Sequence, residues 1–185
     1  MTDKLEHHDI AAHRLTPLKQ YTRWDRYRRV MWGLISPLFW GSPRHLYGLR
    51  NQLLRFFGAR VGRGVRIYPS VKVFAPWSLT LGDEVTLAWG VTLYNLASIS
   101  IGSRTIVSQN AHLCAGNHDC RQAHLPFTNR PIVVGEDCWI CADAFVGSGV
   151  TLNRLAVVAA RAVVVKSVPE RAIVGGNPAV IIGER

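Results

Sequence analysis

The chain lacks the features that would place it across a membrane or outside the cell. No apolar run in its 185 residues approaches the roughly 18 that a membrane-spanning helix needs. The first 15 residues are polar and charged, so they lack the apolar core of a secretory signal peptide. These absences predict a cytoplasmic protein, so that any contact with a membrane would be peripheral and at its inner face.

Acidic residues are scarce in the first third of the chain. Residues 1–66 hold 13 Lys/Arg and 4 Asp/Glu, whereas residues 67–185 hold 9 and 8. The net charge of +10 therefore belongs almost entirely to the N-terminal region, which predicts an anionic partner there. An anionic membrane surface is favoured, and nucleic acid is not expected because no recognition motif accompanies the charge.

Cysteines are also few. The four are Cys114, Cys120, Cys138 and Cys141, and in a cytosolic protein they should be reduced. Cys138 and Cys141 have the spacing of half a zinc site, but Cys114 and Cys120 do not supply the second close pair that a structural site needs. We therefore interpret them as small buried side chains and expect no metal.

The sequence predicts a basic, amphipathic helical extension over residues 1–57, with a loose tail at its start. Residues 21–29 interleave arginine with aromatic side chains, and residues 30–40 are apolar with two tryptophans. Arginine beside tryptophan and phenylalanine is typical of a helix lying on an anionic leaflet. The alternative is that the apolar face packs on the rest of the protein or on a neighbouring subunit.

Helix-breaking residues within this extension predict two helices. Pro37 and then Gly41-Ser42-Pro43 should break the first. Leucines then recur at three and four residues up to Phe57, and Gly58 should end this second helix.

From Val61 onward, aliphatic residues recur every six positions, often followed by glycine or alanine. The hexads open at Val61, Ile67, Val73, Leu81, Leu87, Leu93, Ile101, Val107, Leu113, Val134, Ile140, Val146, Leu152, Val158 and Val164. Three hexads make one triangular turn of a parallel β-helix, with residues one and five of each hexad facing inward and glycine at the corners. A sandwich of alternating strands does not explain a period of six. We assign residues 58–185 to this domain.

The repeats stop once, between Cys114 and Pro131, which predicts an inserted loop over residues 114–133. His118 lies near its start. Loops held by rigid elements commonly carry function, and a histidine is the usual base for a hydroxyl group because its pKa lies near neutrality. Asp119 could orient the ring, but adjacent residues point apart on an extended chain, so another carboxylate or a backbone carbonyl remains equally open.

Four features together resemble the left-handed β-helix hexapeptide acetyltransferases. They are the hexads, the break at Asn117-His118-Asp119, and the segments Asp137-Cys138-Trp139-Ile140 and Gly176-Asn177-Pro178-Ala179. The resemblance is greatest to the colanic-acid, or exopolysaccharide, type of O-acetyltransferase, which is related to the galactoside, maltose and NodL-like enzymes. It implies an all-β fold, a left-handed parallel β-helix with an N-terminal helical extension.

The resemblance also implies an activity. A homotrimer would transfer an acetyl group from acetyl-CoA to a hydroxyl of a saccharide or lipid-linked saccharide in exopolysaccharide biosynthesis. His118 matches the family's catalytic base. Trp139 matches an aromatic residue beside the site, Ala142 and Ala160 match positions whose backbone contacts the pantetheine arm, and Lys166 matches a basic residue near the CoA phosphates.

The acceptor side of the site is less well matched. A family asparagine falls at Ala88 here, and Asn95 is a substitute for it. Asn117 and Asp119, which flank His118, complete the expected acceptor-binding residues.

Two other functions fit a β-helix. One is a metal-dependent hydratase of the γ-carbonic-anhydrase type, with His112, His118 and His124 as ligands. These histidines are six residues apart, so they should fall on successive faces and not converge. The other is a non-enzymatic scaffold or membrane adaptor.

Overall fold

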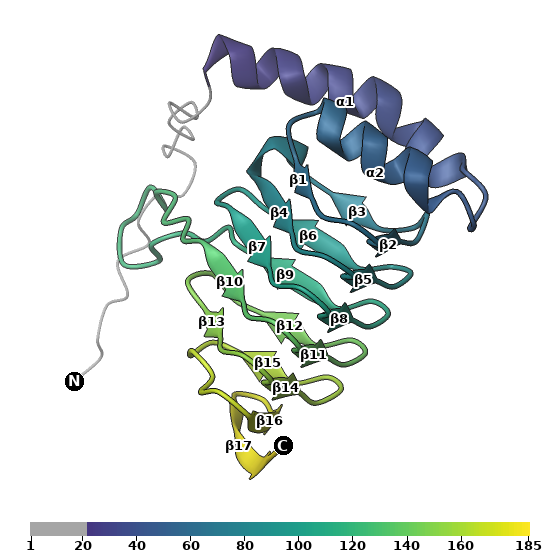
Figure 1. The fold of residues 1–185 in the computed structure, drawn as a ribbon. Coiled ribbons are helices and arrows are strands. Elements are labelled where there is room, and N and C mark those ends of the chain that lie inside the picture. Colours follow the sequence, from purple (N-terminus) through teal and green to yellow (C-terminus); the bar gives the residue numbers. More distant parts are fainter. Residues whose placement is uncertain (1–21) are drawn as a thin grey trace.

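The computed structural model describes residues 22–185, so the predicted N-terminal tail lies outside the described residues. Two helices lie across one end of a column of short strands, and one long loop projects from the side of the column (Figure 1). Neither α1 nor α2, the α-helices of this part of the chain, combines the length and the apolar character that crossing a bilayer requires.

Helix α1 (Arg23–Gly41) begins with a capping box and does not break at Pro37. The prediction of a break there is wrong. Proline removes the hydrogen bond to the carbonyl four residues earlier, which is that of Gly33. The hydroxyl of Ser36 donates to this carbonyl instead, at 3.2 Å. The helix therefore continues to Gly41 and ends at the predicted second break.

One face of α1 packs on the strands, as the packing interpretation predicts. Trp32 and Phe39 are buried, and the indole nitrogen of Trp32 donates to the carbonyl of Val73 at 2.8 Å. Helix α2 (Tyr47–Phe56) follows, and Gly58, with φ +93°, ends it as predicted. The two helices thus close the first end of the strand column.

The strands form three sheets, which we name A, B and C. Sheet A contains β1 (Arg60–Val61), β4 (Leu79–Leu81), β7 (Ile99–Ile101), β10 (Ile132–Val134) and β13 (Thr151–Leu152). Sheet B contains β2 (Arg66–Ile67), β5 (Thr86–Leu87), β8 (Ile106–Val107), β11 (Trp139–Ile140), β14 (Val157–Val158), β16 (Ala172–Gly176) and β17 (Ala179–Glu184). Sheet C contains β3 (Lys72–Val73), β6 (Thr92–Tyr94), β9 (His112–Cys114), β12 (Phe145–Val146) and β15 (Val163–Val164). A short 3₁₀ helix (Pro76–Ser78) precedes β4.

The chain visits sheets A, B and C in turn, so each coil of the helix has A–B, B–C and C–A corners. Pairing between coils is parallel, with Leu81 opposite Ile101 and Val134 opposite Leu152. Within residues 22–185 there are five complete coils and the start of a sixth. The parallel β-helix predicted from the hexads is confirmed.

The core consists of the hexad positions that the repeat predicts to face inward. Residues one and five of the third coil, for example Val107 and Ala111, are fully buried. At the A–B corner the glycines stack one above another. A Cβ atom on Gly102 would lie 2.6 Å from the backbone nitrogen of Glu136 and from the carbonyl carbon of Gly135. Glycine is required there because backbone approaches backbone.

The C-terminal end of the column is closed by an antiparallel pair of strands. After β16 the chain turns at the cis Asn177–Pro178 bond, and β17 pairs with β16 in the antiparallel direction. Strand β16 would otherwise leave a row of unpaired backbone groups at the edge of sheet B, and β17 satisfies them.

Candidate functional site

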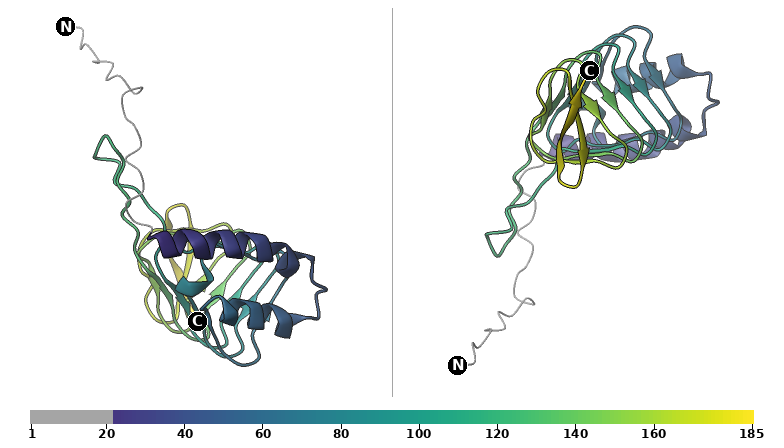
Figure 2. Two further views of the ribbon diagram at one scale, coloured as in Figure 1. Left: turned by 90° about the horizontal axis from the view of Figure 1, so that it is seen from above. Right: turned by 90° about the horizontal axis from the view of Figure 1, so that it is seen from below.

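The inserted loop, residues 115–131, leaves the C–A corner between β9 and β10 and stands away from the body of the molecule (Figure 2). Its two arms pair with each other near the root, where His118 and Phe127 form an antiparallel bridge. The amide of Thr128 donates to the carbonyl of Asn117 at 2.9 Å. Backbone pairing therefore fixes the segment that carries His118.

The ring of His118 is held on two sides. Its Nδ1 atom lies 2.5 Å from the carbonyl oxygen of Leu125, and its ring centroid lies 4.2 Å from that of Phe127. A carbonyl oxygen can only accept, so in the neutral ring the proton resides on Nδ1 and the lone pair on Nε2. The structure thus gives a backbone carbonyl, and not Asp119, as the group that orients the ring.

The side chains that flank His118 bind to the loop itself. The carboxylate of Asp119 accepts from the amide of Arg121 and from the side chain of Gln122, both at 3.0 Å. The side-chain oxygen of Asn117 accepts from the amide of His118 at 2.9 Å. Both residues therefore shape the loop around the histidine.

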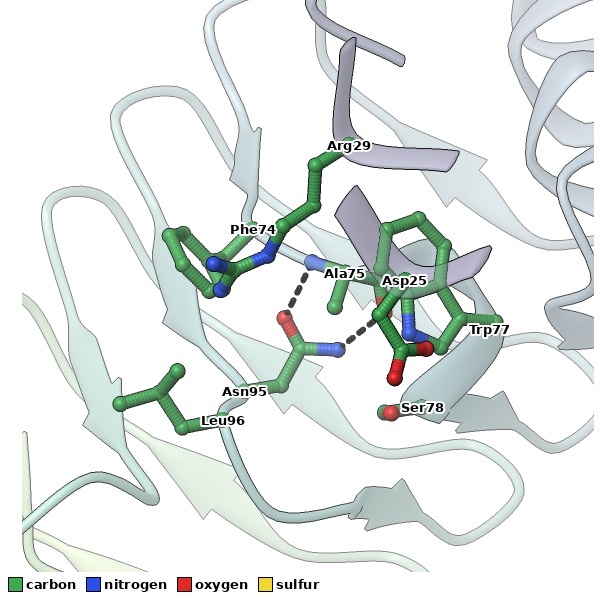
Figure 3. Close-up of a pocket in the computed structure, with 8 residues that line it drawn as sticks. All are labelled: Asp25, Arg29, Phe74, Ala75, Trp77, Ser78, Asn95 and Leu96. Carbon is green, nitrogen blue, oxygen red and sulfur yellow. Dashed lines mark hydrogen bonds between the residues drawn. The ribbon is translucent and has the colours of Figure 1, made fainter. Parts of the chain in front are cut away.

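Asn95 is fully buried and ties two coils together. Its amide oxygen accepts from the backbone of Ala75 at 3.0 Å, and its amide nitrogen donates to the carbonyl of Ala75 at 2.6 Å (Figure 3). Both polar atoms of the Asn95 side chain are already engaged in hydrogen bonds to Ala75, so we do not assign Asn95 a hydrogen bond to the acceptor.

A polar pocket of about 210 Å³ lies between the start of α1 and the C–A corner (Figure 3). Its lining residues are Asp25, Arg29, Phe74, Ala75, Trp77, Ser78, Asn95 and Leu96. Hydrogen bonds from Thr22, both from its hydroxyl and from its amide, hold the pKa of Asp25 below its usual value. The guanidinium of Arg29 lies 4.3 Å from the ring centroid of Phe74.

This pocket adjoins the root of the inserted loop. A Cβ atom placed on Gly116, two residues before His118, would lie 2.8 Å from the side chain of Leu96. Asp25 and Arg29 were not predicted to line a site, because an aspartate within a run of arginines is typical of the solvated face of a helix. Their position opposite the C–A corner identifies them, but that position is known only once α1 is packed on the strands.

The residues expected to contact CoA fall into two places. Trp139, in β11 on sheet B, is half-exposed, and its indole nitrogen donates to the hydroxyl of Ser108 at 3.0 Å. Ala142 and Ala160 are neighbours at the B–C corner, where the amide of Arg161 donates to the carbonyl of Ala142 at 2.9 Å.

Lys166 instead follows β15, at the C–A corner, and is exposed. It shares this corner with His118. The structure therefore groups Trp139, Ala142 and Ala160 along one edge of sheet C, and His118 and Lys166 along the other edge.

The histidines of the hydratase alternative lie in different environments. His112 is on the outer face of sheet C and meets the ring of Phe145 edge-on, at 5.5 Å between centroids. Burial lowers its pKa. His118 and His124 are in the loop. In the described range 22–185, no three His, Cys, Asp or Glu side chains come together in a group that could hold a metal ion.

The cysteines occupy hexad positions and the loop. Cys138 takes the inward fifth position of its hexad, where burial raises the pKa of its thiol. Cys114 and Cys141 are half-buried and Cys120 is exposed in the loop, so the prediction of buried side chains is wrong for these three.

The fold is shared with solved acetyltransferases of the left-handed β-helix class. A hexapeptide-repeat acetyltransferase of Vibrio cholerae O1 biovar eltor, solved with acetyl coenzyme A, is 26% identical with a TM-score of 0.79, covering 88% of this chain and 90% of that one. A galactoside acetyltransferase solved with coenzyme A superimposes with a TM-score of 0.82 at 21% identity, covering 89% and 84%. The predicted left-handed β-helix is confirmed.

Sequence relatives place the chain more narrowly. It is 45% identical over 157 residues to "Putative colanic acid biosynthesis acetyltransferase WcaF" of Escherichia coli strain K12, covering 85% of this chain and 86% of that protein. Galactoside O-acetyltransferase of the same strain is 22% identical over 138 residues, covering 73% and 68%. No protein-family model matches the chain. The chain belongs to the hexapeptide-repeat acetyltransferases and is an enzyme of that class.

Proposed function

We propose that the protein transfers an acetyl group from acetyl-CoA to a sugar hydroxyl in exopolysaccharide biosynthesis, with His118 as the general base. The observation that carries the role of His118 is its hydrogen bond to Leu125, which leaves Nε2 as the basic atom. The 45% identity to a relative named for colanic acid biosynthesis supports the exopolysaccharide assignment. The acetyl-CoA bound in the Vibrio structure supports the donor.

The chemistry requires a base because the pKa of a sugar hydroxyl lies far above 7. Nε2 of His118 takes the hydroxyl proton as the oxygen attacks the thioester carbonyl, and the CoA thiolate then leaves. General-base catalysis of this kind contributes roughly 10² to 10⁴ in rate. Holding donor and acceptor together supplies much of the remaining acceleration, so no acyl-enzyme is needed.

The pocket of Asp25 and Arg29 is the proposed site of the acceptor. A saccharide offers hydroxyl groups that both donate and accept. The carboxylate of Asp25 can accept from them, the guanidinium of Arg29 can donate to them, and Ser78 can do either. The pocket adjoins the loop root that carries His118, which suits a hydroxyl presented to Nε2.

We propose that the enzyme is a homotrimer with sites between subunits. Within one chain, sheet C separates His118 from Ala142 and Ala160. A neighbouring subunit that presents its B–C corner to this C–A corner would join the two halves of the site. Sedimentation equilibrium checks the mass, and a monomer that is fully active would contradict this arrangement.

Thiol release from acetyl-CoA in the presence of a panel of saccharides tests the activity. We expect release with at least one saccharide or lipid-linked saccharide, and a large loss in His118→Ala. His124→Ala is the matched control, because His124 is an exposed histidine of the same loop. If His118→Ala leaves turnover unchanged, His118 is not the general base. If no saccharide in the panel gives thiol release, the proposed acceptor class is wrong.

A lipid-linked saccharide is presented at the surface of the bilayer. We therefore propose a cytoplasmic enzyme that associates peripherally with the inner face of the membrane. The excess of basic residues in the N-terminal third supports this location.

A further inference from the structure

The outer face of α1 carries a stripe of exposed apolar side chains. Tyr27, Val30, Leu34 and Leu38 are 55%, 61%, 68% and 63% exposed. Their spacing of three, four and four residues places them on one side of the helix. The packed side, which holds Trp32 among others, is already buried against the strands. The stripe is therefore additional to the apolar surface that the fold needs.

The apolar surface continues onto the end of α2. Trp24 and Phe56 are 63% and 84% exposed, and the Trp24 and Tyr27 rings stack with centroids 5.5 Å apart. A shallow groove of about 460 Å³ lies among these rings, Met31 and Phe57. Tryptophan and tyrosine rings favour the boundary between lipid and water, because each has an apolar body and a polar tip.

Charge identifies the partner that this surface fits. Residues 22–66 contain ten arginines and one aspartate. Arg23 and Arg26 are exposed and lie four residues before Tyr27 and Val30, so they stand at the N-terminal end of the stripe. A second copy docked with its own stripe against this one would bring the same positive charge to the contact and be repelled. An anionic bilayer surface offers both the opposite charge and an apolar layer beneath it.

We propose that Trp24, Tyr27, Val30, Leu34, Leu38 and Phe56 form a membrane-docking surface that seats α1 in the plane of an anionic leaflet. Asp25 and Arg29 lie on the packed face of the same helix, opposite the stripe, and line the proposed acceptor pocket. Docking therefore holds that pocket one helix diameter, roughly 10 Å, from the lipid surface, within reach of a saccharide linked to a lipid. The inference rests on the proposed membrane location, and its test measures binding alone.

The test uses sedimentation of the full chain with vesicles of phosphatidylcholine, with and without phosphatidylglycerol, over a range of salt concentrations. We expect binding to the anionic vesicles that weakens with salt. The double variant Leu34→Gln/Leu38→Gln should lower the partition coefficient tenfold or more, and Arg23→Gln/Arg26→Gln should weaken binding and reduce its salt dependence. The matched control is Val180→Gln/Ile182→Gln, since these residues are 61% and 62% exposed on β17 at the other end of the column.

Several outcomes would overturn the inference. They are equal binding to neutral and anionic vesicles, no binding to either, wild-type binding by the leucine variant, or an equal loss in the β17 control. A smaller oligomer in the leucine variant, seen by light scattering, would assign the stripe to contacts between copies. Circular dichroism checks that each variant folds. Acetyl transfer to a soluble saccharide, measured without vesicles, reports separately on the enzyme's activity.

Discussion

The Nδ1 atom of His118 and the carbonyl oxygen of Leu125 lie 2.5 Å apart, across the pairing that closes the inserted loop. Leu125 has φ +46°, a left-handed conformation that is uncommon for a leucine. Its amide donates to the carbonyl of Gln122 at 2.9 Å, which holds this turn. The backbone conformation of Leu125 thus aims its carbonyl at the histidine, which makes Leu125 a positioning residue.

Substitutions at Leu125 should separate backbone geometry from side-chain contacts. Leu125→Pro removes the amide and forces φ to about −65°, so the carbonyl should turn away and kcat should fall tenfold or more. Leu125→Gly allows the same φ and should keep kcat within a few-fold of the wild type. Steady-state kinetics measures both, with the KM for acetyl-CoA expected to stay constant. Equal activity in the two variants would show that this carbonyl does not position His118.

The acceptor pocket predicts an effect on KM at Asp25. Asp25→Asn keeps an oxygen that can accept from Thr22 and so preserves the cap, but it removes the charge. A hydrogen bond to a charged group contributes about 1.5–3 kcal/mol, so the KM for the acceptor should rise about tenfold or more while that for acetyl-CoA does not change. Asp83→Asn, at the distant A–B corner, is the control. An acceptor KM that stays at the wild-type value would place the acceptor elsewhere.

The stacked glycines predict a stability difference between two alanine substitutions. Gly102→Ala would place a Cβ atom 2.6 Å from the backbone of the next coil, and overpacking of this kind costs about 1–3 kcal/mol or more. Gly33→Ala, in α1, meets nothing within 4 Å and should stabilise by about 0.5–1 kcal/mol through helix propensity. Thermal unfolding measures both. A Gly102→Ala protein as stable as the wild type would contradict the close approach of the coils.

An ion pair at the A–B corner should make stability depend on pH. Arg104 bonds both carboxylate oxygens of Asp137, at 2.8 and 2.9 Å, and holds the pKa of that carboxyl below its usual value near 3.8. Since the pKa is lowered by folding, the stabilisation is present above pH 3.8 and is lost as the pH falls through the native value. Arg104→Met should therefore unfold at a lower temperature at pH 7, with the difference from wild type narrowing in acid. A difference independent of pH would show that the pair does not contribute.

The sequence was most informative where structure is local and repeated. A six-residue period identifies Val107 and Ala111 as core positions without knowledge of any other coil, because each coil repeats the geometry of the last. Gly58 ends α2 for an equally local reason, its positive φ. Both the hexads and this helix end are determined by a few neighbouring residues.

Features that depend on distant or compensating contacts were missed. Pro37 was predicted to break the helix. The sequence pattern does not show that the hydroxyl of Ser36 donates a hydrogen bond to the carbonyl of Gly33. Asn95 was predicted to bind the acceptor, because the sequence does not show that its side chain bonds the backbone of Ala75, one coil away. The orienting carbonyl of Leu125 and the pocket at Asp25 both require the folded loop and the packed α1.

The most direct measurement is the fate of a ¹³C-labelled acetyl group supplied as acetyl-CoA together with a saccharide acceptor, followed by NMR. We expect a labelled ester on a sugar hydroxyl with the wild-type protein. We also expect His118→Ala to form the ester roughly 10² to 10⁴ times more slowly, while it binds acetyl-CoA as the wild type does. An ester formed equally fast without the imidazole, or the absence of any labelled ester on every saccharide offered, would contradict the proposed mechanism.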